Sequence, residues 1–324
     1  MKTVIFALVF ALAVSWLTVP WVRLLAIRCG VVDKPGERRM HPDAMPRWGG
    51  IAIWLGVIGG VLGAELIGAF GGWFEITPSV AALLGAATLV AAVGLLDDKY
   101  DLSAVHQAGA VLLAAILVAQ FGVRIDWFTN PLTRHAEQIP ALLVVPITAI
   151  WLFAVTKTVD LIDGLDGLAA GVCAIASLAL VAMALLMPIP HVTQPVAVVC
   201  AALTGASLGF LRLNYPPAKI IMGTVGAQFM GFIIAGSAII GAFKMAAAFA
   251  ILVPILALGV PIFDAVFAVA RRAAAGRPIY MPDRGHIHHR LIDAGLTTNQ
   301  AILVIYAATF LLSAGALVMV LAVR

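Results

Sequence analysis

One short segment combines three aspartates with two glycines among apolar residues. Residues 157–168 contain Asp160, Asp163, Asp166, Gly164 and Gly167. A spacing of three residues puts the carboxylates near one face if the turn is helical, and the glycines let backbone approach a ligand closely. Carboxylates in so apolar a setting are costly unless they bind something. We therefore interpret this segment as part of a site that binds a ligand or does chemistry.

A second acidic motif is the adjacent pair Asp97 and Asp98, which is followed by Lys99. Adjacent carboxylates repel each other at low dielectric and need a cation or a shared proton. Mg²⁺ would satisfy the pair, since it prefers one or two carboxylates together with phosphate oxygens. An ordinary polar helix end is the alternative interpretation.

Three histidines lie close together in the segment 282–291, namely His286, His288 and His289. They could coordinate a transition metal, but no cysteine or distant histidine completes a zinc set. Asp283, Arg284 and Arg290 surround them, so the segment equally suits diphosphate binding and proton transfer. A solvated loop is a third interpretation.

Two further polar segments carry cations beside prolines and glycines. Residues 33–50 include His41 and Arg47 and suit an anionic ligand or anionic lipid headgroups. In the other, Asn214 and Lys219 flank a Pro-Pro break, and Gly-x-x-Gly opens the next apolar segment at Gly223. A helix N-terminus with glycines can seat an anion, although the same pattern also serves helix packing in membranes.

The rest of the chain is far too apolar for a soluble domain. Of its 324 residues, 63% are hydrophobic and 11% charged, against about a quarter charged in soluble domains. The apolar stretches are continuous instead of alternating, which argues against a β-barrel. We predict an all-α polytopic integral membrane protein, with one transmembrane domain over residues 1–324 and about ten spanning helices. The expected spans are 3–26, 50–70, 79–96, 104–121, 139–155, 167–188, 195–211, 220–241, 246–270 and 300–322.

The charges give an orientation. With the N-terminus outside and alternating spans, 15 of the 20 basic residues fall on the inner side, as the positive-inside rule requires. Both termini are then extracytoplasmic, and the expected cytoplasmic loops are 27–49, 97–103, 156–166, 212–219 and 271–299. Twelve of the 16 acids also fall inside, which that rule does not require, so we predict a cytoplasmic active face. The outer loops are short and carry few polar residues, and the middle of the spans contains few ionisable residues. Both features argue against a transporter.

Together these motifs resemble those of the polyprenyl-phosphate N-acetylhexosamine-1-phosphate transferases, glycosyltransferase family 4. The matching stretches occur in the family order from residue 33 to 291. They are His41-Pro with Pro-Arg-Trp-Gly-Gly50, Asp97-Asp98, Asp163-Gly-Leu-Asp-Gly-Leu168, Asn214 with Pro-Ala-Lys219 and Met-Gly223, and Pro282-Asp-Arg-Gly-His-Ile-His-His-Arg-Leu291. The histidine motif looks closer to the UDP-GlcNAc:undecaprenyl-phosphate branch than to the phospho-N-acetylmuramoyl-pentapeptide branch.

The resemblance implies a metal-dependent sugar-1-phosphate transferase in a bacterial inner membrane. Such enzymes move N-acetylhexosamine-1-phosphate from a UDP-sugar to polyprenyl phosphate, release UMP and use Mg²⁺ or Mn²⁺. The product would enter cell-envelope polysaccharide synthesis, including that of lipopolysaccharide. The implied partners are the UDP-sugar, the polyprenyl phosphate and membrane lipids, with no nucleic acid. Homodimer formation is left open.

The same resemblance implies roles for individual residues. Catalysis is assigned to Asp97, Asp98 and Asp163. Substrate binding is assigned to Asp166, Gly164, Asn214, Lys219, Arg284, His286, His288, His289, Arg290, His41 and Arg47. Metal binding is assigned to Asp97 and Asp98.

Two positions depart from the family pattern. The family usually has Asn-x-x-Asn where this chain has Lys157 and Asp160, and an aspartate that ligates the metal where this chain has Thr224. A hydroxyl is a poorer ligand than a carboxylate for a hard dication. We hypothesise that Asp160 supplies the missing charge as a third metal ligand, although Lys157 could merely neutralise it. A degenerate relative that binds nucleotide sugar or lipid phosphate without turnover is the alternative function.

Overall fold

The computed structural model describes residues 1–33, 44–71, 74–129, 135–186, 190–242, 255, 258–274 and 286–323. Its long helices are α1 (Lys2–Arg28), α2 (Gly50–Gly71), α3 (Pro78–Tyr100), α5 (Ala141–Ile162), α6 (Leu168–Leu186), α7 (Pro190–Asn214), α8 (Gly223–Ala242) and α12 (Thr298–Val323). The shorter helices are α4 (Ala104–Ala119), α10 (Gly259–Ala274) and α11 (Ile287–Asp293). Two small antiparallel hairpins pair β1 (Val32–Asp33) with β2 (Met45–Pro46) and β3 (Trp127–Thr129) with β4 (Ala136–Gln138).

The prediction of a helical polytopic membrane protein is confirmed. Eight described helices are long and apolar enough to cross a membrane, and they correspond to eight of the ten expected spans. The expected span 104–121 is the 16-residue helix α4, and the expected span 246–270 lies largely outside the described residues. The total of ten spans and the orientation in the membrane stay predictions.

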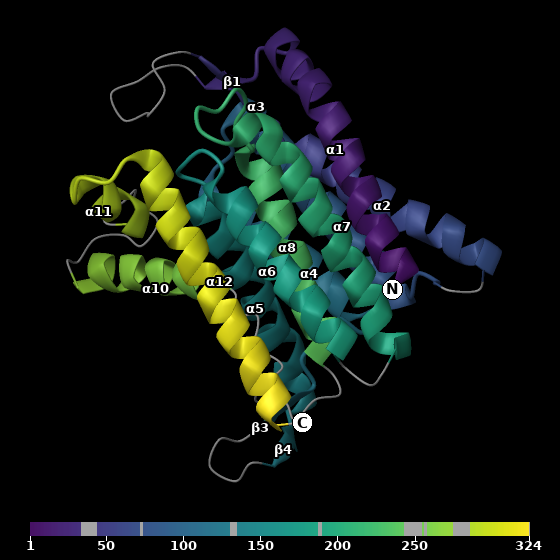
Figure 1. The fold of residues 1–324 in the computed structure, drawn as a ribbon. Coiled ribbons are helices and arrows are strands. Elements are labelled where there is room, and N and C mark those ends of the chain that lie inside the picture. Colours follow the sequence, from purple (N-terminus) through teal and green to yellow (C-terminus); the bar gives the residue numbers. More distant parts are fainter. Residues whose placement is uncertain are drawn as a thin grey trace.

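Helix α8 forms the centre of the bundle. Within its most apolar window 94% of residues are buried, compared with 28% for α12 at the periphery. Helices α2, α3, α5, α6 and α7 all pack against α8, and α1 covers α2 and α7 from outside (Figure 1). Gly50 of α2 lies against the backbone of Gly226. This contact lets the beginning of α2 approach the beginning of α8 more closely than any side chain would allow.

The two ends of the bundle differ. The β1–β2 hairpin, the end of α3 and α11 lie toward one end, whereas β3 and β4 lie at the other, where α1 begins and α12 ends (Figure 1). Several helices continue into the expected loops: α3 runs through Tyr100, α5 through Ile162 and α7 through Asn214. Continuing the helix past its apolar stretch keeps backbone groups hydrogen-bonded while polar side chains emerge.

Candidate active site

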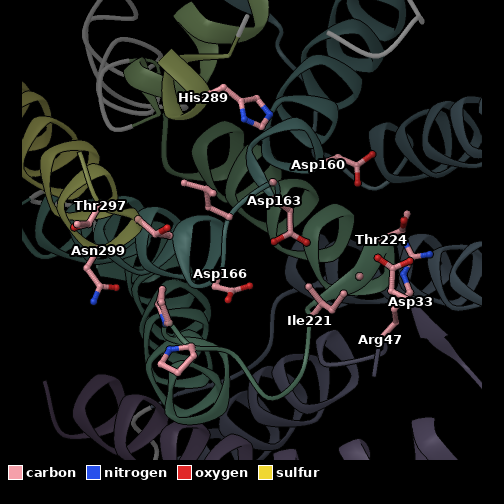
Figure 2. A pocket seen from close by; sticks show the side chains of 16 residues that line it. Asp33, Arg47, Asp160, Asp163, Asp166, Ile221, Thr224, His289, Thr297 and Asn299 are labelled. Atoms are coloured by element: carbon pink, nitrogen blue, oxygen red, sulfur yellow. The ribbon is translucent and has the colours of Figure 1, made fainter. Parts of the chain in front are cut away.

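A cavity of about 760 Å³ opens where the helix ends meet. It lies between the α5–α6 loop, the α7–α8 loop, α11 and the beginning of α12 (Figure 2). Its lining residues are Asp33, Arg47, Asp160, Asp163, Gly164, Leu165, Asp166, Pro216, Pro217, Ile221, Gly223, Thr224, His289, Thr297, Thr298 and Asn299. Segments separated by more than 250 residues thus contribute to one space, and it is acidic on one side.

Asp163 stands immediately after the last residue of α5, at the cavity wall. Burial raises the pKa of its carboxyl well above the usual range, and the neighbouring carboxylates of Asp160, Asp98 and Asp166 raise it further. Arg47 acts in the opposite direction. A cation in the cavity would relieve this mutual repulsion and favour the ionised form.

Asp166 and Asn214 connect the two loops that form the cavity wall. Asp166 Oδ2 accepts a hydrogen bond from Ala218 N at 3.1 Å. Asn214 Oδ1 accepts from Gly167 N at 2.9 Å, and its amide donates to Ile220 O at 3.0 Å. Asp166 also lines the cavity, whereas Asn214 is 1% exposed and supports the wall from behind.

The Asp98 carboxylate occupies the N-terminus of α8. It accepts hydrogen bonds from Thr224 N at 3.0 Å and from Val225 N at 3.3 Å. Arg47 Nη2 lies 3.4 Å from Oδ1. The anion seat expected at this glycine-rich helix start therefore holds one of the protein's own carboxylates, directly behind the cavity wall formed by Gly223 and Thr224.

Arg47 reaches this position because the segment before α2 is joined by backbone hydrogen bonds to the segment before α8. Ile221 N donates to Pro46 O at 2.9 Å, and Gly49 N donates back to Ile221 O at 3.0 Å. The intervening Trp48 has a φ of 77° and its indole donates to Leu95 O of α3 at 3.2 Å. This small ladder places the guanidinium beside Asp98.

Asp97 faces a different helix from its neighbour. It is buried, and its Oδ1 accepts from Gln107 Nε2 of α4 at 2.8 Å. Donors from two different helices thus stabilise the adjacent carboxylates separately. Among the described residues, neither Asp97 nor Asp98 lines the cavity itself.

Asp160 and Lys157 form an ion pair. Lys157 Nζ lies 2.9 Å from Asp160 Oδ2, which also accepts from Gln228 Nε2 at 3.2 Å. Asp160 and Thr224 line the same cavity, as the compensation hypothesis requires. Sequence reasoning missed Gln107 and Gln228, although a polar side chain inside an apolar span such as Gln228 is a usable signal.

The three histidines have three different environments. His286 Nδ1 lies 2.8 Å from Asp264 Oδ2, and Asp264 Oδ1 accepts from Ile287 N, so this pair holds α11 to α10. His288 is 2% exposed and packs against Gly164. Burial, followed by the neighbouring His289 and His286, lowers the pKa of His288 to about 4. Only His289 of the three lines the cavity, pointing toward Asp163 from above (Figure 2).

The remaining predicted residues are placed as follows. Gly164 lines the cavity, and a β-carbon there would lie 2.9 Å from His288 Nε2. Lys219 is exposed, and its carbonyl accepts from Arg23 Nε at 2.9 Å. Arg290 is exposed and lines a second, apolar cavity between α10, α11 and α12. His41 and Arg284 lie outside the described residues.

The donor chemistry of the cavity suits a hard dication. The part of the chain that the structure describes contains no group of three acidic, histidine or cysteine side chains placed to hold a metal alone. Asp160, Asp163 and Asp166 nevertheless offer carboxylate oxygens along one wall (Figure 2). Mg²⁺ needs only one or two such ligands when phosphate oxygens and water complete its shell, so these residues fit a metal that arrives with a diphosphate.

Comparison with known proteins gives a consistent set of relatives. Residues 80–242 match the model of the family described as glycosyl transferase family 4. The chain is 39% identical to a probable undecaprenyl-phosphate N-acetylglucosaminyl 1-phosphate transferase of Bacillus subtilis, over 96% of this chain and 85% of that protein. It is 33% identical to a decaprenyl-phosphate N-acetylglucosaminephosphotransferase of Mycolicibacterium smegmatis, over 94% and 79%. It is 27% identical to an undecaprenyl-phosphate alpha-N-acetylglucosaminyl 1-phosphate transferase of Escherichia coli, over 92% and 79%.

Proposed function

Since the chain belongs to glycosyl transferase family 4, we propose that it transfers N-acetylglucosamine-1-phosphate from UDP-GlcNAc to a polyprenyl phosphate and releases UMP. The names of the relatives in three bacterial genera support both the sugar and the lipid class. The single observation that carries the proposal is the cavity, where Asp160, Asp163 and Asp166 converge with Arg47 and His289. This set can hold a metal-bound diphosphate.

The chemistry needs a base for the lipid phosphate and a stabilised leaving group. The resemblance assigns the removal of the remaining proton of the lipid phosphate to the carboxylate of Asp98 or Asp97. Neither lines the cavity, so in this proposal the lipid phosphate must reach one of them past the wall at Gly223 and Thr224. The freed phosphate oxygen attacks the β-phosphorus of UDP-GlcNAc, a new P–O bond forms, and the bond between the β-phosphorus and the bridging oxygen breaks to release UMP. Because phosphoryl transfer depends mainly on positioning and charge neutralisation, fixed carboxylates and cations suffice for this reaction.

A two-step route would use the same residues. An aspartate attacks the β-phosphorus, the bond to the bridging oxygen breaks to release UMP, and GlcNAc-1-phosphate stays on the aspartate as an acyl phosphate. The lipid phosphate then attacks that phosphorus and displaces the aspartate. Incubating the protein with labelled UDP-GlcNAc in the absence of lipid separates the routes, since only the two-step route leaves label on the protein.

The sequence assigned the metal to Asp97, Asp98 and Asp160. Because Asp160 and Asp163 line the cavity whereas Asp97 and Asp98 do not, we propose Asp160 and Asp163 as the residues that would hold Mg²⁺ or Mn²⁺. When bound, the metal supplies neutralisation of the diphosphate charge. Arg47 and His289 complement that charge with side chains that donate to phosphate oxygens. Thr297, Thr298 and Asn299 also line the cavity and offer hydroxyl and amide groups, which suit hydrogen bonds to the neutral parts of a nucleotide sugar. Figure 2 shows Thr297 and Asn299 on the opposite side of the cavity from Arg47 and Thr224.

The proposed setting is the inner membrane of a bacterium, with the cavity on the cytoplasmic side. UDP-sugars are water-soluble, so the acidic cavity must open toward the compartment that contains them. The lipid acceptor reaches the same place from the bilayer. We assign the reaction to the first membrane step of a cell-envelope polysaccharide.

Thr224 favours a second candidate function, binding without turnover. It stands where the family pattern has a metal-ligating aspartate, and the new acid Asp160 is paired with Lys157. A protein of this kind would retain nucleotide sugar or lipid phosphate but release no UMP.

The deciding experiment uses purified protein with decaprenyl or undecaprenyl phosphate and a panel of UDP-sugars. We expect UMP release with UDP-GlcNAc that depends on Mg²⁺ and on the lipid. Tight binding of UDP-GlcNAc without UMP release would support the second candidate, and neither binding nor release contradicts both.

A further inference from the structure

A closed ring of hydrogen bonds joins α4, α5 and α8 beside the cavity. Gln107 Oε1 accepts from Lys157 Nζ at 2.8 Å and from Gln228 Nε2 at 3.2 Å. Asp160 Oδ2 accepts from the same two donors, at 2.9 and 3.2 Å. We call these four residues (Gln107, Lys157, Asp160 and Gln228) the Gln107 network.

The network determines which way the Gln107 amide points. With two donors directed at its oxygen, the amide nitrogen must face the opposite side, where it donates to Asp97 Oδ1 at 2.8 Å. A flipped amide would place its NH₂ group against the Lys157 ammonium and its oxygen against the Asp97 carboxylate. Both contacts are repulsive, because an ammonium has no acceptor and an ionised carboxylate has no donor.

Burial makes this arrangement strict. Gln228 is 1% exposed and Asp97 is 7% exposed, and the Lys157 and Asp160 side chains are 23% and 22% exposed. Water therefore has little access to Gln228 and Asp97 to substitute for a missing partner, and a partly satisfied buried polar network is costly. The network also joins three helices to α3, so it fixes Asp97 relative to the cavity wall.

We propose that Gln107 is a positioning residue that holds the Asp97 carboxylate in one orientation, and that Lys157 and Gln228 lock the Gln107 amide for this purpose. The inference rests on the proposed function, in which Asp97 serves the transfer. It gives Lys157 a role as a fixed cation that acts on Asp97 through Gln107. The departure from the family pattern at residues 157 and 160 thus also contributes to the support of the site, in addition to the charge that Asp160 offers to the cavity.

The first test asks whether Gln107 acts through Asp97. Gln107→Leu keeps the approximate volume and removes both hydrogen-bonding ends, and we expect kcat to fall about 10- to 100-fold, as for other partners that orient a reacting group, with the KM for UDP-GlcNAc within about twofold. In an Asp97→Asn background the same substitution should cause no further fall in kcat. Multiplicative effects of the two substitutions would overturn the inference, because residues that act as a unit are non-additive.

The second test asks whether the Lys157 charge locks the amide. Lys157→Met should lower kcat about 10-fold, and Lys157→Arg should recover most of the loss, since a guanidinium can still donate to both acceptors. Lys99→Met is the matched control: Lys99 is exposed in the last turn of α3, and its Nζ lies 5.3 Å from the centroid of the Tyr100 ring. It should leave kcat unchanged. Equal effects of Lys157→Met and Lys99→Met would overturn the proposed lock.

A third measurement separates this inference from the proposed function. Thermal unfolding of the substrate-free protein is recorded for Gln107→Leu, Lys157→Met and the double variant, with Lys99→Met again as control. We expect the losses in melting temperature for Gln107 and Lys157 to be non-additive, as for residues in one network, and additive losses overturn the inference. A wild-type protein that releases no UMP would refute the proposed function, while this thermal cycle would still decide whether the Gln107 network exists.

Discussion

Gly223 offers a sharp test of the position of Asp98, because it stands at the N-terminus of α8 with a φ of +75°. A β-carbon at this position would lie 2.8 Å from Asp98 Cγ and closer still to Oδ2. Two carbons in contact are normally about 3.5–4.0 Å apart, so in Gly223→Ala the Asp98 carboxyl group must move by about 1 Å. A displacement of about 1 Å in a catalytic group can cost roughly 100-fold in rate.

Gly30→Ala provides the matched control for backbone strain. Gly30 also has a positive φ, +70°, but it lies at the exposed end of α1, where a β-carbon would meet no atom within 4 Å. Both substitutions should therefore destabilise the protein by about 1–2 kcal/mol through the left-handed backbone.

The assay measures UMP release and thermal unfolding for both variants. We expect a loss of melting temperature for both variants, larger for Gly223→Ala because the displaced Asp98 carboxylate also weakens its hydrogen bonds to Thr224 N and Val225 N. A fall in kcat of about 100-fold is expected for Gly223→Ala alone. If Gly223→Ala retains the same kcat as Gly30→Ala, then the Asp98 position does not matter for turnover and the proposed role of Asp98 is wrong.

Three further predictions concern the cavity and its walls. In a radiolabelled UDP-GlcNAc assay, Asp160→Asn should lower turnover and raise the Mg²⁺ concentration needed for activity. Adding Thr224→Asp should restore the turnover and the original Mg²⁺ requirement. Unchanged turnover and metal dependence for Asp160→Asn alone would contradict the compensation hypothesis. The pKa of His288 is lowered from 6.5 to about 4, so between these values the unfolded chain takes up a proton that the folded protein does not. The free energy of unfolding should thus fall as the pH drops from 6.5 to 4, by at most about 3 kcal/mol. In thermal melts, His288→Asn should reduce this dependence of stability on pH. An unchanged pH dependence argues against a buried neutral imidazole. Tyr306→Phe removes a hydrogen bond of 2.6 Å to Gly167 O and should cost about 1 kcal/mol in unfolding experiments, whereas an unchanged melting temperature means that this bond does not stabilise the loop.

The spans were predictable because lipid imposes a simple rule on the sequence. A backbone in hydrocarbon must be helical and apolar over about 20 residues, and eight such helices are present among the described residues. Lengths and ends were harder to predict: α4 has only 16 residues, and α10 begins at Gly259 with large apolar side chains such as Phe263 and Phe267 exposed. Apolar length alone does not specify which face of a helix packs.

The site was predictable in its residue types but not in its pairings. Asp163 and Asp166 do line one cavity, although α5 ends at Ile162 and the carboxylates meet across a turn instead of along a helix face. Sequence reasoning treated Asp97 and Asp98 as one unit, but they face different helices. Such pairings depend on contacts between helices distant in sequence, which local spacing does not encode.

Gln107 is a residue whose proposed role local sequence spacing could not reveal. Nothing in its neighbourhood in the sequence marks it as functional, and its role appears only when α3, α4, α5 and α8 are packed together. The three histidines likewise form one motif in the sequence, but His286 is hydrogen-bonded to Asp264, His288 is buried and His289 lines the cavity.

The most direct measurement of the central claim follows the β-phosphate. Purified protein is given polyprenyl phosphate, Mg²⁺ and UDP-GlcNAc labelled with ³²P at the β-position. Transfer of sugar-1-phosphate requires the label to appear in the lipid fraction, in a one-to-one ratio with UMP. Label that stays in the aqueous phase as UDP, or that remains in intact UDP-GlcNAc, would contradict the proposed bond cleavage and with it the function.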